Sequence, residues 1–347
     1  MAPRRARRTA AFLLAAAALL ACLAAGGLGA LAFLARPAPA IPAEGRLFSV
    51  ERGEGSGRVA RRLAGEGLLR SPLAFLLLAK ARGEESSIKA GTYLVKPGQG
   101  AVELLDDLVS GRQALVRVTL PEGYTLGQAG ALLERLGVAT KAEFLAAAAD
   151  PALLSELGIP APSLEGYLFP DTYLLPVQYG AEDTARAMVR AFKERLASMP
   201  EAAALSPAEL HDRLILASIV EREYRVPEEA PLMASVFYNR LRINMALQSC
   251  ATVVYLITER RGKPHPEQLF DRDIAIQDPY NTYLHRGLPP GPISNPGLTA
   301  LEAALRPAKS NFLYFRLVDP EQGRHHFSTS LEEHVGARSL YVKRLGG

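Results

Sequence analysis

One glutamate, Glu221, stands in a sequence environment that suits proton transfer. It lies in the segment LILASIVERE, residues 214–223, whose centre is apolar on nearly every face of a helix and is therefore predicted to be buried. On a 3.6-residue period Glu221 shares an apolar stripe with Leu214 and Ala217. Burial penalises the charged form of a carboxyl, so we expect a raised pKa and a general acid able to protonate a glycosidic oxygen.

A second interpretation of Glu221 stays open at this stage. It could be an exposed glutamate near a helix end, paired with Arg222 or Arg225. Glu223 lies about 200° around a helix from Glu221, so these two carboxyls do not form a pair on one face. The segment therefore offers one well-placed carboxyl.

The segment LEGYLFPDTY, residues 164–173, combines acidic and aromatic side chains around a Pro-Asp turn. Tyr167 and Tyr173 could wall a sugar cleft, while Glu165 and Asp171 accept hydrogen bonds from hydroxyls. The alternative is a turn packed on the core, with Asp171 capping backbone amides.

A second polar and aromatic group, Tyr280, Asn281 and Tyr283, precedes the stiff loop GLPPGP, residues 287–292. A proline-rich loop is a preorganised wall with little entropy left to lose, so this group could border a binding cleft. The alternative is a purely structural role.

The cysteines and histidines do not predict a metal site or a cofactor. Cys22 and Cys250 are too far apart to form a disulfide if Cys22 lies at membrane depth. A Cys250 nucleophile is conceivable, but a small buried thiol is the interpretation that we adopt. His325 and His326 are adjacent, so on a strand they point to opposite faces.

The net charge of +4 equals the contribution of Arg4, Arg5, Arg7 and Arg8, so the rest of the chain is close to neutral and no nucleic-acid partner is predicted. Residues 11–35 are apolar and about long enough to span a bilayer. The preceding arginines place residues 1–10 in the cytoplasm and the bulk of the chain outside the cytoplasmic (inner) membrane. A cleaved signal peptide and a lipoprotein site at Cys22 are the alternatives.

The elements that must position these residues follow the membrane anchor and form two parts. The predicted fold class is α+β. Residues 36–46 read as a linker and residues 47–115 as a small module, with helices at 59–67, 72–81 and 101–108 and a strand at 88–95. Residues 116–347 form a larger, mainly helical domain with small sheets. Its start resembles the start of the module, since Gly123 and Gly137 repeat Gly53 and Gly67 at one offset.

Three capping patterns predict helix starts in the larger domain: Ser206 with Glu209, Thr299 with Glu302, and Ser330 with Glu333. Residues 312–318 and 325–327 predict a hairpin around the turn DPEQG.

Several long strings resemble, in order, the motifs of the endolytic murein transglycosylase (YceG-like) family. They are LEGYLFPDTY, ASIVERE (217–223), VFYNRL (236–241), YNTY (280–283), GLPPGPISNPG (287–297) and HHFSTSLEEH (325–334). The resemblance runs from about residue 45 to the end. It departs from the family at Cys250 and Ala251, where an aspartate and a proline are usual.

The resemblance implies a lytic cut of the β-1,4 bond between N-acetylmuramic acid and N-acetylglucosamine within a peptidoglycan strand, which leaves a 1,6-anhydro end and limits strand length. Glu221 matches the family's catalytic glutamate. The resemblance adds Glu223, Asn239 and Gln248 to the substrate-binding candidates, describes residues 47–115 as a LysM-like module, and makes peptidoglycan synthases candidate partners. The alternatives are a non-catalytic peptidoglycan-binding scaffold and a hydrolase that uses water.

Overall fold

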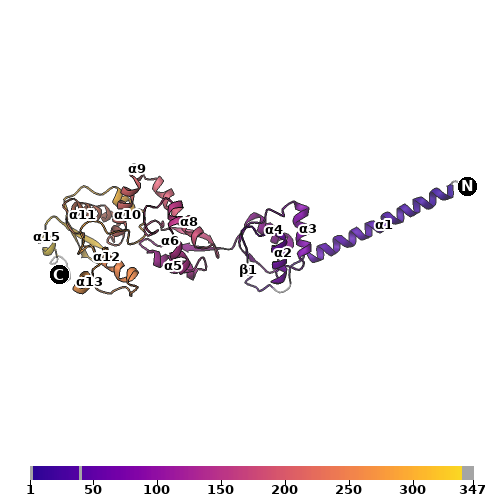
Figure 1. Ribbon diagram of the computed structural model, residues 1–347, viewed down its shortest axis with the longest axis horizontal. Helices are drawn as coiled ribbons and strands as arrows, with labels where there is room; N and C mark the ends of the chain where they lie inside the picture. Colours follow the sequence, from indigo (N-terminus) through magenta and orange to yellow (C-terminus); the bar gives the residue numbers. More distant parts are fainter. Residues whose placement is uncertain (1–2, 39–40, 338–347) are drawn as a thin grey trace. The chain divides into compact units, whose positions relative to one another are not determined.

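The computed structural model describes residues 3–38 and 41–337, with the backbone alone for residues 3–13 and 15. The side chains of the four N-terminal arginines, residues 39–40 of the predicted linker, and residues 338–347 of the predicted larger domain therefore lie outside the described part. The chain forms two compact units, Met1–Leu115 with Pro176–Gln178, and Val116–Leu175 with Tyr179–Gly347 (Figure 1).

The first unit begins with one long helix, α1 (Pro3–Leu34), which leads to a small βααβ arrangement (Figure 1). Strand β1 (Arg46–Val50), helices α2 (Ser56–Gly65) and α3 (Pro72–Arg82), and strand β2 (Gly91–Val95) are followed by α4 (Ala101–Ser110). β1 and β2 pair antiparallel, with Arg46 opposite Val95. Apolar side chains from all of these elements after α1 form one core, which includes Phe48, Leu63, Phe75, Tyr93 and Leu105.

Phe75 and Tyr93, two of the few aromatic residues of this module, are 0% and 1% exposed. Their role is therefore packing rather than contact with a ligand. The Tyr93 hydroxyl donates to the carbonyl of Lys89 at 2.7 Å, which satisfies its polar atom inside the core.

The second unit is mainly helical and carries two small two-stranded sheets, β3 with β4 and β5 with β6, of which the second is antiparallel. Its elements are, in order, β3 (Leu115–Thr119), α5 (Leu126–Arg135), α6 (Lys141–Ala148), α7 (Pro151–Glu156), β4 (Thr172–Pro176), α8 (Ala181–Ala197), α9 (Pro200–Ala203), α10 (Pro207–Glu221), η1 (Pro227–Glu229), α11 (Ala230–Arg242), α12 (Cys250–Tyr255), η2 (Leu256–Arg260), α13 (Asp271–Ile274), α14 (Leu298–Leu305), β5 (Tyr314–Asp319), β6 (Arg324–Ser328) and α15 (Leu331–Gly336). The fold is thus mixed, with many helices and small sheets, as the sequence predicts.

Helix α10 is the centre of this unit, and local sequence explains why it begins where it does. The Ser206 hydroxyl accepts from the Glu209 backbone N–H at 3.3 Å, and the Glu209 carboxylate accepts from the Ser206 N–H at 2.9 Å. Pro207 occupies the first turn, where no N–H is needed. From Leu214 to Val220 every side chain is buried, as predicted, and α10 packs on α11 and α14.

Some predicted element boundaries are wrong. α10 ends at Glu221, with Arg222 as its C-cap, two residues earlier than expected. Helix α14 starts at Leu298 after Gly297, so Thr299 is not its cap. Strand β2 starts at Gly91, three residues later than expected. The Ser330 cap and the hairpin β5–β6 are confirmed.

Candidate active site

Glu221 is the last residue of α10, and its carboxyl is half-buried at the start of α14. The backbone N–H of Gly297 donates to Oε2 of Glu221 at 2.9 Å, and in the described residues no other donor bonds this carboxyl. Burial raises the pKa of Glu221 to about 7, the negative charge of Glu122 adds to the rise, and the Gly297 N–H and Arg222 oppose it. The predicted direction is therefore confirmed, and no described ion pair joins Glu221 to Arg222 or Arg225.

The loop of residues 291–297 is attached to α10 through Ser218. The Ile293 N–H donates to the Ser218 hydroxyl at 2.9 Å, and the Ser294 hydroxyl donates to the Ser218 carbonyl at 3.1 Å. Ser218 and Ser294 are both fully buried. These bonds fix the loop against the helix that carries Glu221, so the Gly297 N–H is held in a constant position relative to the carboxyl.

A tight turn at Gly123 covers the other side of Glu221. Gly123 has a φ of +74°, and a Cβ added there would lie 3.5 Å from Cγ of Glu221, so the backbone passes in contact with the carboxyl-bearing side chain. The Gly123 N–H donates to the Asn295 carbonyl at 2.9 Å. Nη1 of Arg222 donates to the Gly123 carbonyl at 3.0 Å. The turn is thereby tied both to α10 and to the loop before α14.

A second carboxylate, Glu122, lies beside this arrangement. A Cβ added to Gly297 would come within 1.9 Å of Oε1 of Glu122, so only glycine leaves room for the carboxylate here. The side chain of Glu122 is otherwise exposed. Its charge sits close to the backbone amide that holds Glu221 and disfavours a second negative charge nearby.

Glu165 lies behind the site and organises its backbone. It is 5% exposed, and its two oxygens accept from the Leu126 N–H, the first residue of α5, at 3.0 and 3.2 Å. Nδ2 of Asn295 donates to it at 3.4 Å and to the Tyr124 carbonyl at 2.9 Å. Burial raises the pKa of Glu165 to about 8, against the lowering effect of the Leu126 N–H. Glu165 therefore supports the site from the interior.

Three predicted substrate-binding residues are buried and have their polar groups bonded within the protein. The Tyr167 hydroxyl meets Nδ1 of His211 at 2.7 Å. Nδ2 of Asn239 donates to the carbonyls of residues 310 and 312, both at 2.9 Å. Nδ2 of Asn281 donates to the carbonyls of residues 274 and 276. These three positions hold loops in place and have no polar group to offer a ligand.

Three other predicted residues, Glu223, Gln248 and Tyr283, come together around a cavity of about 500 Å³. The Ser249 hydroxyl donates to Oε1 of Glu223 at 2.5 Å. Glu223 thus points away from the Gly297 amide that holds Glu221, and the two carboxyls have separate surroundings. Tyr280 lies elsewhere, with its ring 5.3 Å from that of Tyr255.

Asp171 and Tyr173 lie at β4. Oδ1 of Asp171 accepts from the Thr172 N–H at 2.7 Å, which is the backbone-capping alternative, and the Tyr173 hydroxyl donates to the Phe169 carbonyl. Within the described residues neither side chain makes a hydrogen bond or an ion pair with Glu221 or Gly297. The described contacts therefore do not link Asp171 and Tyr173 to Glu221.

Cys250 corrects one prediction, because its thiol is exposed rather than buried. It is the first residue of the short helix α12, and its Sγ lies 3.0 Å from the Tyr283 hydroxyl at the cavity that Glu223 borders. Among residues 3–38 and 41–337 no group of three or more His, Cys, Asp or Glu side chains is arranged to hold a metal ion.

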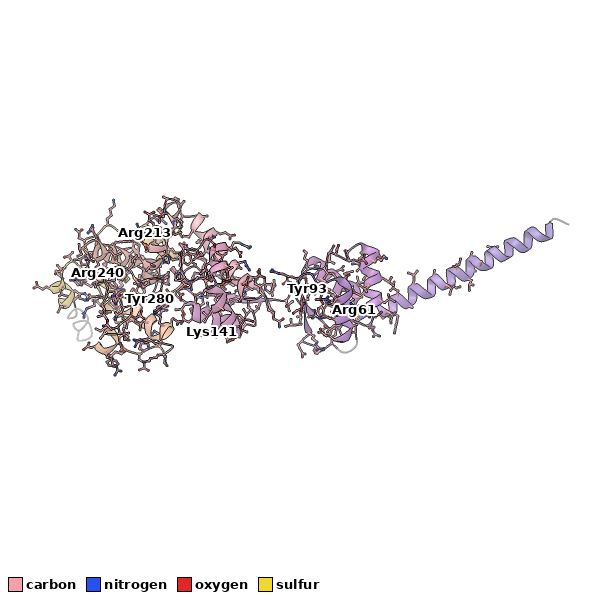
Figure 2. The ribbon with its side chains drawn as sticks, in the orientation of Figure 1. Arg61, Tyr93, Lys141, Arg213, Arg240 and Tyr280 are labelled. Atoms are coloured by element: carbon pink, nitrogen blue, oxygen red, sulfur yellow. The ribbon has the colours of Figure 1, made fainter. Side chains whose placement is uncertain are left out.

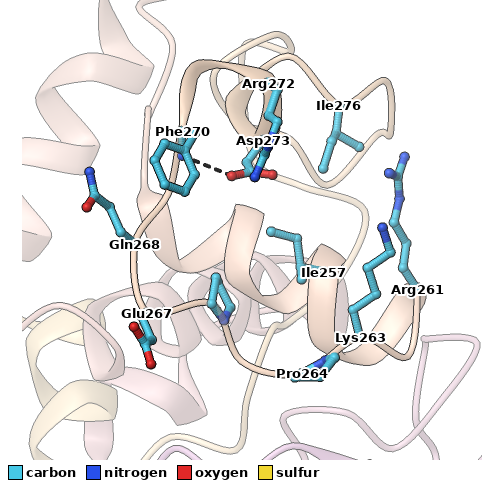
Figure 3. A pocket seen from close by; sticks show the side chains of 11 residues that line it. Ile257, Arg261, Lys263, Pro264, Glu267, Gln268, Phe270, Arg272, Asp273 and Ile276 are labelled. Carbon is cyan, nitrogen blue, oxygen red and sulfur yellow. Dashed lines mark hydrogen bonds between the residues drawn. The ribbon is translucent and has the colours of Figure 1, made fainter.

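Two further cavities lie in the second unit. One of about 240 Å³ is lined by Arg222, Tyr255 and Glu259 and adjoins the residue next to Glu221. The other, of about 670 Å³, lies between η2 and α13 and includes none of the predicted site residues. Figure 3 shows Ile257 and Ile276 in this cavity, with Arg261 and Lys263 along one side. Its volume alone does not connect it to the chemistry of Glu221.

The sequence does not predict Glu122 and Asn295 as members of the site. Asn295 stands within the string GLPPGPISNPG and Glu122 directly before Gly123, but neither position shows a periodicity or spacing that indicates its neighbours. The signal lies in the fold, which brings residues 122–123 and 295–297 to the end of α10.

Comparisons with known proteins agree on one relationship. A family model described as the YceG-like family matches residues 48–339. The chain is 30% identical over 311 residues to a Bacillus subtilis protein named endolytic murein transglycosylase, with 85% of this chain and 84% of that protein covered. A Streptococcus pneumoniae protein of the same name is 29% identical, with 93% of this chain covered. The chain spans 64% of the length of that streptococcal relative.

A solved structure is also similar. The crystal structure of a YceG-like protein from Listeria monocytogenes matches with a TM-score of 0.57 and 30% sequence identity, covering 85% of this chain and 99% of that chain.

Proposed function

The chain belongs to the YceG-like family, and on that premise we propose that it is a membrane-anchored lytic transglycosylase that cuts peptidoglycan within its glycan strands. Its target is the β-1,4 bond between N-acetylmuramic acid and N-acetylglucosamine, and its product carries a 1,6-anhydro-muramoyl end. The relatives named endolytic murein transglycosylase support a peptidoglycan transglycosylase. The bond, the product and the site are our proposal.

In the proposed mechanism Glu221 acts first as an acid and then as a base. Its carboxyl proton goes to the glycosidic oxygen as the bond to the anomeric carbon breaks, and the leaving sugar departs with a new hydroxyl. The carboxylate then takes the proton of the muramic acid hydroxyl on carbon six, whose oxygen attacks the anomeric carbon and closes the anhydro ring. The proton count balances, water is not consumed, and Glu221 ends protonated.

One observation carries this proposal: Glu221 is a half-buried carboxyl with a pKa of about 7 and a single described donor, the Gly297 N–H on Oε2. Near neutral pH a large share of such a carboxyl holds its proton, as a general acid requires. The ionised form that follows proton donation is stabilised by the same N–H. A single group can therefore act as both acid and base. A retaining or inverting hydrolase instead requires two enzyme carboxyls, one on each side of the scissile bond.

The remaining parts of the chain are proposed to hold and locate the enzyme. Residues 16–34 of α1 are long and apolar enough to span a membrane, although a signal sequence would meet the same criterion. We place residues 1–10 in the cytoplasm and both folded units outside the cytoplasmic membrane. The βααβ order of the first unit suits a LysM-like, glycan-holding module, and limiting strand length suits a position near peptidoglycan synthases.

The test is Glu221→Gln with Glu228→Gln as the matched control. Glu228 is exposed and carries no described hydrogen bond or ion pair, so its variant should cut strands like the parent. Glu221→Gln keeps the shape of the side chain but has no titrating proton, so kcat should fall by roughly 10²- to 10⁴-fold. Strand cleavage is measured by separating the muropeptide products.

The same assay separates the rival functions. Anhydro ends are about 18 Da lighter than the reducing ends that hydrolysis would give, so a mass spectrum identifies the reaction type. Reducing ends would replace our proposal with a hydrolase. Strand binding by the wild-type protein without any cleavage would indicate a non-catalytic scaffold.

A further inference from the structure

The cavity that Glu223 borders has features that cleavage of a glycosidic bond does not require. It occupies about 500 Å³ between α11, the start of α12, β5 and α15. We call it the arginine pocket, and its distinctive lining residues are Arg240, Arg316, His334, Phe237, Phe315 and Leu331. Two cations and an apolar wall thus face the same space.

Arg240 is a buried cation that has no carboxylate partner among the described residues. It is 8% exposed, and its Nε and Nη1 donate to the carbonyls of Leu313 and Leu247 at 2.6 and 2.7 Å. Within the described residues Nη2 donates to no acceptor and no ion pair includes Arg240. Its guanidinium lies over the Tyr314 ring at 5.2 Å. Burial lowers the pKa of this guanidinium, as expected where a buried cation is not neutralised.

Arg316 lines the same pocket as Arg240. In the part of the chain that the structure describes, its side chain makes no hydrogen bond and no ion pair. His334 stacks on Tyr314 with ring centroids 5.2 Å apart, and its buried Nδ1 has no hydrogen-bond partner there. Burial lowers the pKa of His334, and the nearby positive charge of Arg316 lowers it further. Among the described residues that line it, the pocket therefore offers several donors and a single carboxyl, that of Glu223.

Glu223 does not neutralise the two arginines of the pocket. Glu223 lines the pocket, but no oxygen of Glu223 lies within ion-pair distance of either arginine. Burial raises the pKa of Glu223, which favours its neutral form. Glu223 is two residues from Glu221, so their Cα atoms are at most about 7 Å apart. A ligand in the pocket thus lies close to the residue that cuts the strand.

We propose that the arginine pocket binds a free carboxylate on the peptide arm of the muramic acid next to the scissile bond. The inference rests on the proposed function, because it takes peptidoglycan as the substrate. Sugar rings that carry only hydroxyl and acetamido groups have no charge to match two arginines, whereas the peptide arms carry carboxylates. Guanidinium groups bind carboxylates through paired N–H donors. Phe237, Phe315 and Leu331 would contact the aliphatic side chains of the arm.

The test compares two substrates that differ only in charge. One is peptidoglycan strands with intact peptide arms, and the other is the same strands after their peptide carboxyls are converted to amides. The wild-type kcat/KM should fall about tenfold on the amidated strands, since a charged pair gives way to a neutral contact. Equal rates on both would overturn the pocket proposal. No cleavage of either would instead contradict the proposed function, so the two failures are distinguishable.

Arg316→Gln assigns the effect to the pocket, with Arg190→Gln as the matched control. Arg190 is exposed on α8 and has no described partner, so its variant should keep the tenfold preference. Arg316→Gln should cut both substrates at the rate at which wild type cuts amidated strands, with an unchanged melting temperature. Arg316→Lys should recover part of the preference. An Arg316→Gln protein that still prefers unmodified strands would overturn the proposal.

The thiol of Cys250 gives a readout that does not depend on cleavage. It lines the same pocket and is exposed. In the double variant Cys22→Ser, Glu221→Gln, alkylation of Cys250 by iodoacetamide should slow several-fold with intact strands and hardly at all with amidated strands. Equal protection by the two would contradict binding of a carboxylate there.

Discussion

Glu221 has a raised pKa because several neighbours act on the same carboxyl. Burial and the charge of Glu122 favour the protonated form, and the Gly297 N–H and Arg222 favour the ionised form. The balance leaves the pKa at about 7, so each form is accessible near neutral pH. A carboxyl that must first give and then recover a proton needs such a balance.

The first prediction concerns the pH dependence of cleavage. If the protonated form of Glu221 starts the reaction, kcat/KM should be level below about pH 7 and fall tenfold per pH unit above it. The measurement is initial rates on one strand preparation between pH 5 and pH 9. A rate that keeps rising through pH 8 would contradict the role of Glu221 as the acid.

The same pKa predicts how stability changes with pH. Because the folded-state pKa of Glu221 is raised from 4.5 to about 7, its stabilising contribution is complete below pH 4.5 and is lost as pH rises through 7. Glu221→Gln does not titrate, so relative to this variant the wild type should lose at most about 3 kcal/mol of unfolding free energy between pH 4.5 and pH 8. Denaturant unfolding of both proteins measures it, and a constant difference would contradict the shift.

The variant Glu122→Gln tests whether the charge of Glu122 raises the pKa of Glu221. Removing the negative charge lowers the pKa of Glu221, so the alkaline limb of kcat/KM should move to lower pH, and the rate at pH 8 should fall about three- to tenfold. At pH 5.5, where Glu221 stays protonated, the rate should be nearly unchanged. Glu228→Gln should show neither effect. Equal losses at both pH values would mean that Glu122 acts in another way.

At the scale of elements, the turns that hold Glu221 depend on glycine. Gly123 and Gly137 follow the pattern of Gly53 and Gly67 in the first unit, and all four have φ between +69° and +77°. In both units a strand, a left-handed glycine turn and a ten-residue helix follow each other. Of these four glycines, only Gly123 has a titratable side chain within 4 Å of an added Cβ.

Gly123→Ala and Gly137→Ala separate strain from catalysis. Each alanine would occupy a positive φ, which costs about 1–2 kcal/mol. An added Cβ at Gly137 meets nothing within 4 Å, whereas at Gly123 it contacts Cγ of Glu221 at 3.5 Å. Both variants should lose similar stability, but only Gly123→Ala should lose about tenfold in kcat. Equal activities in the two variants would show that the Gly123 turn does not position Glu221.

Local signals explain which elements the sequence predicted. The Ser206 cap, the Ser330 cap and the β5–β6 hairpin depend on neighbours in the chain and are confirmed. Thr299 has the same capping spacing, yet α14 begins after Gly297, whose N–H is bonded to Glu221, 76 positions away in the chain. A tertiary contact decided that boundary, and the sequence does not display it.

The same limit explains the predicted site residues. The apolar stripe of α10 located Glu221, because burial of a helix is visible in its periodicity. Tyr167, Asn239 and Asn281 have polar groups that suit a sugar, but whether a polar group faces the interior depends on the segments folded over it. Their bonds to His211 and to backbone carbonyls exist only in the folded chain. In the first unit the aromatic side chains of Phe75 and Tyr93 are buried in the core.

At the scale of the whole molecule, the two units have separate cores. The cluster around Phe48, Leu63 and Tyr93 shares no residue with the cluster that contains α10. Arg240 and Tyr280, labelled in Figure 2, both belong to the second unit, whereas Tyr93 belongs to the first. All residues of the proposed site and of the arginine pocket lie in the second unit.

The last prediction concerns α1. Residues 16–34 form 19 helical positions, none of them buried within the described structure, and Leu19, Leu20 and Leu23 are each more than 60% exposed. At 1.5 Å per residue this length is about 29 Å, close to the hydrocarbon thickness of a bilayer. Water around so many leucines is unfavourable, by about 1.5–3 kcal/mol for each one left uncovered. A lipid bilayer would cover all of them at once.

Retention of the anchor is therefore expected in cells. The chain should sediment with membranes, resist extraction by high salt, be released by detergent, and give an intact N-terminal peptide by mass spectrometry. A matched variant with Leu20 and Leu23 both changed to Arg should leave the membrane fraction, since each charge in the bilayer centre costs about 3 kcal/mol. A soluble wild-type protein that begins between residues 35 and 41 would instead establish a cleaved signal peptide, and cleavage of strands by that shorter protein would show that the anchor sets where the enzyme acts without taking part in the chemistry.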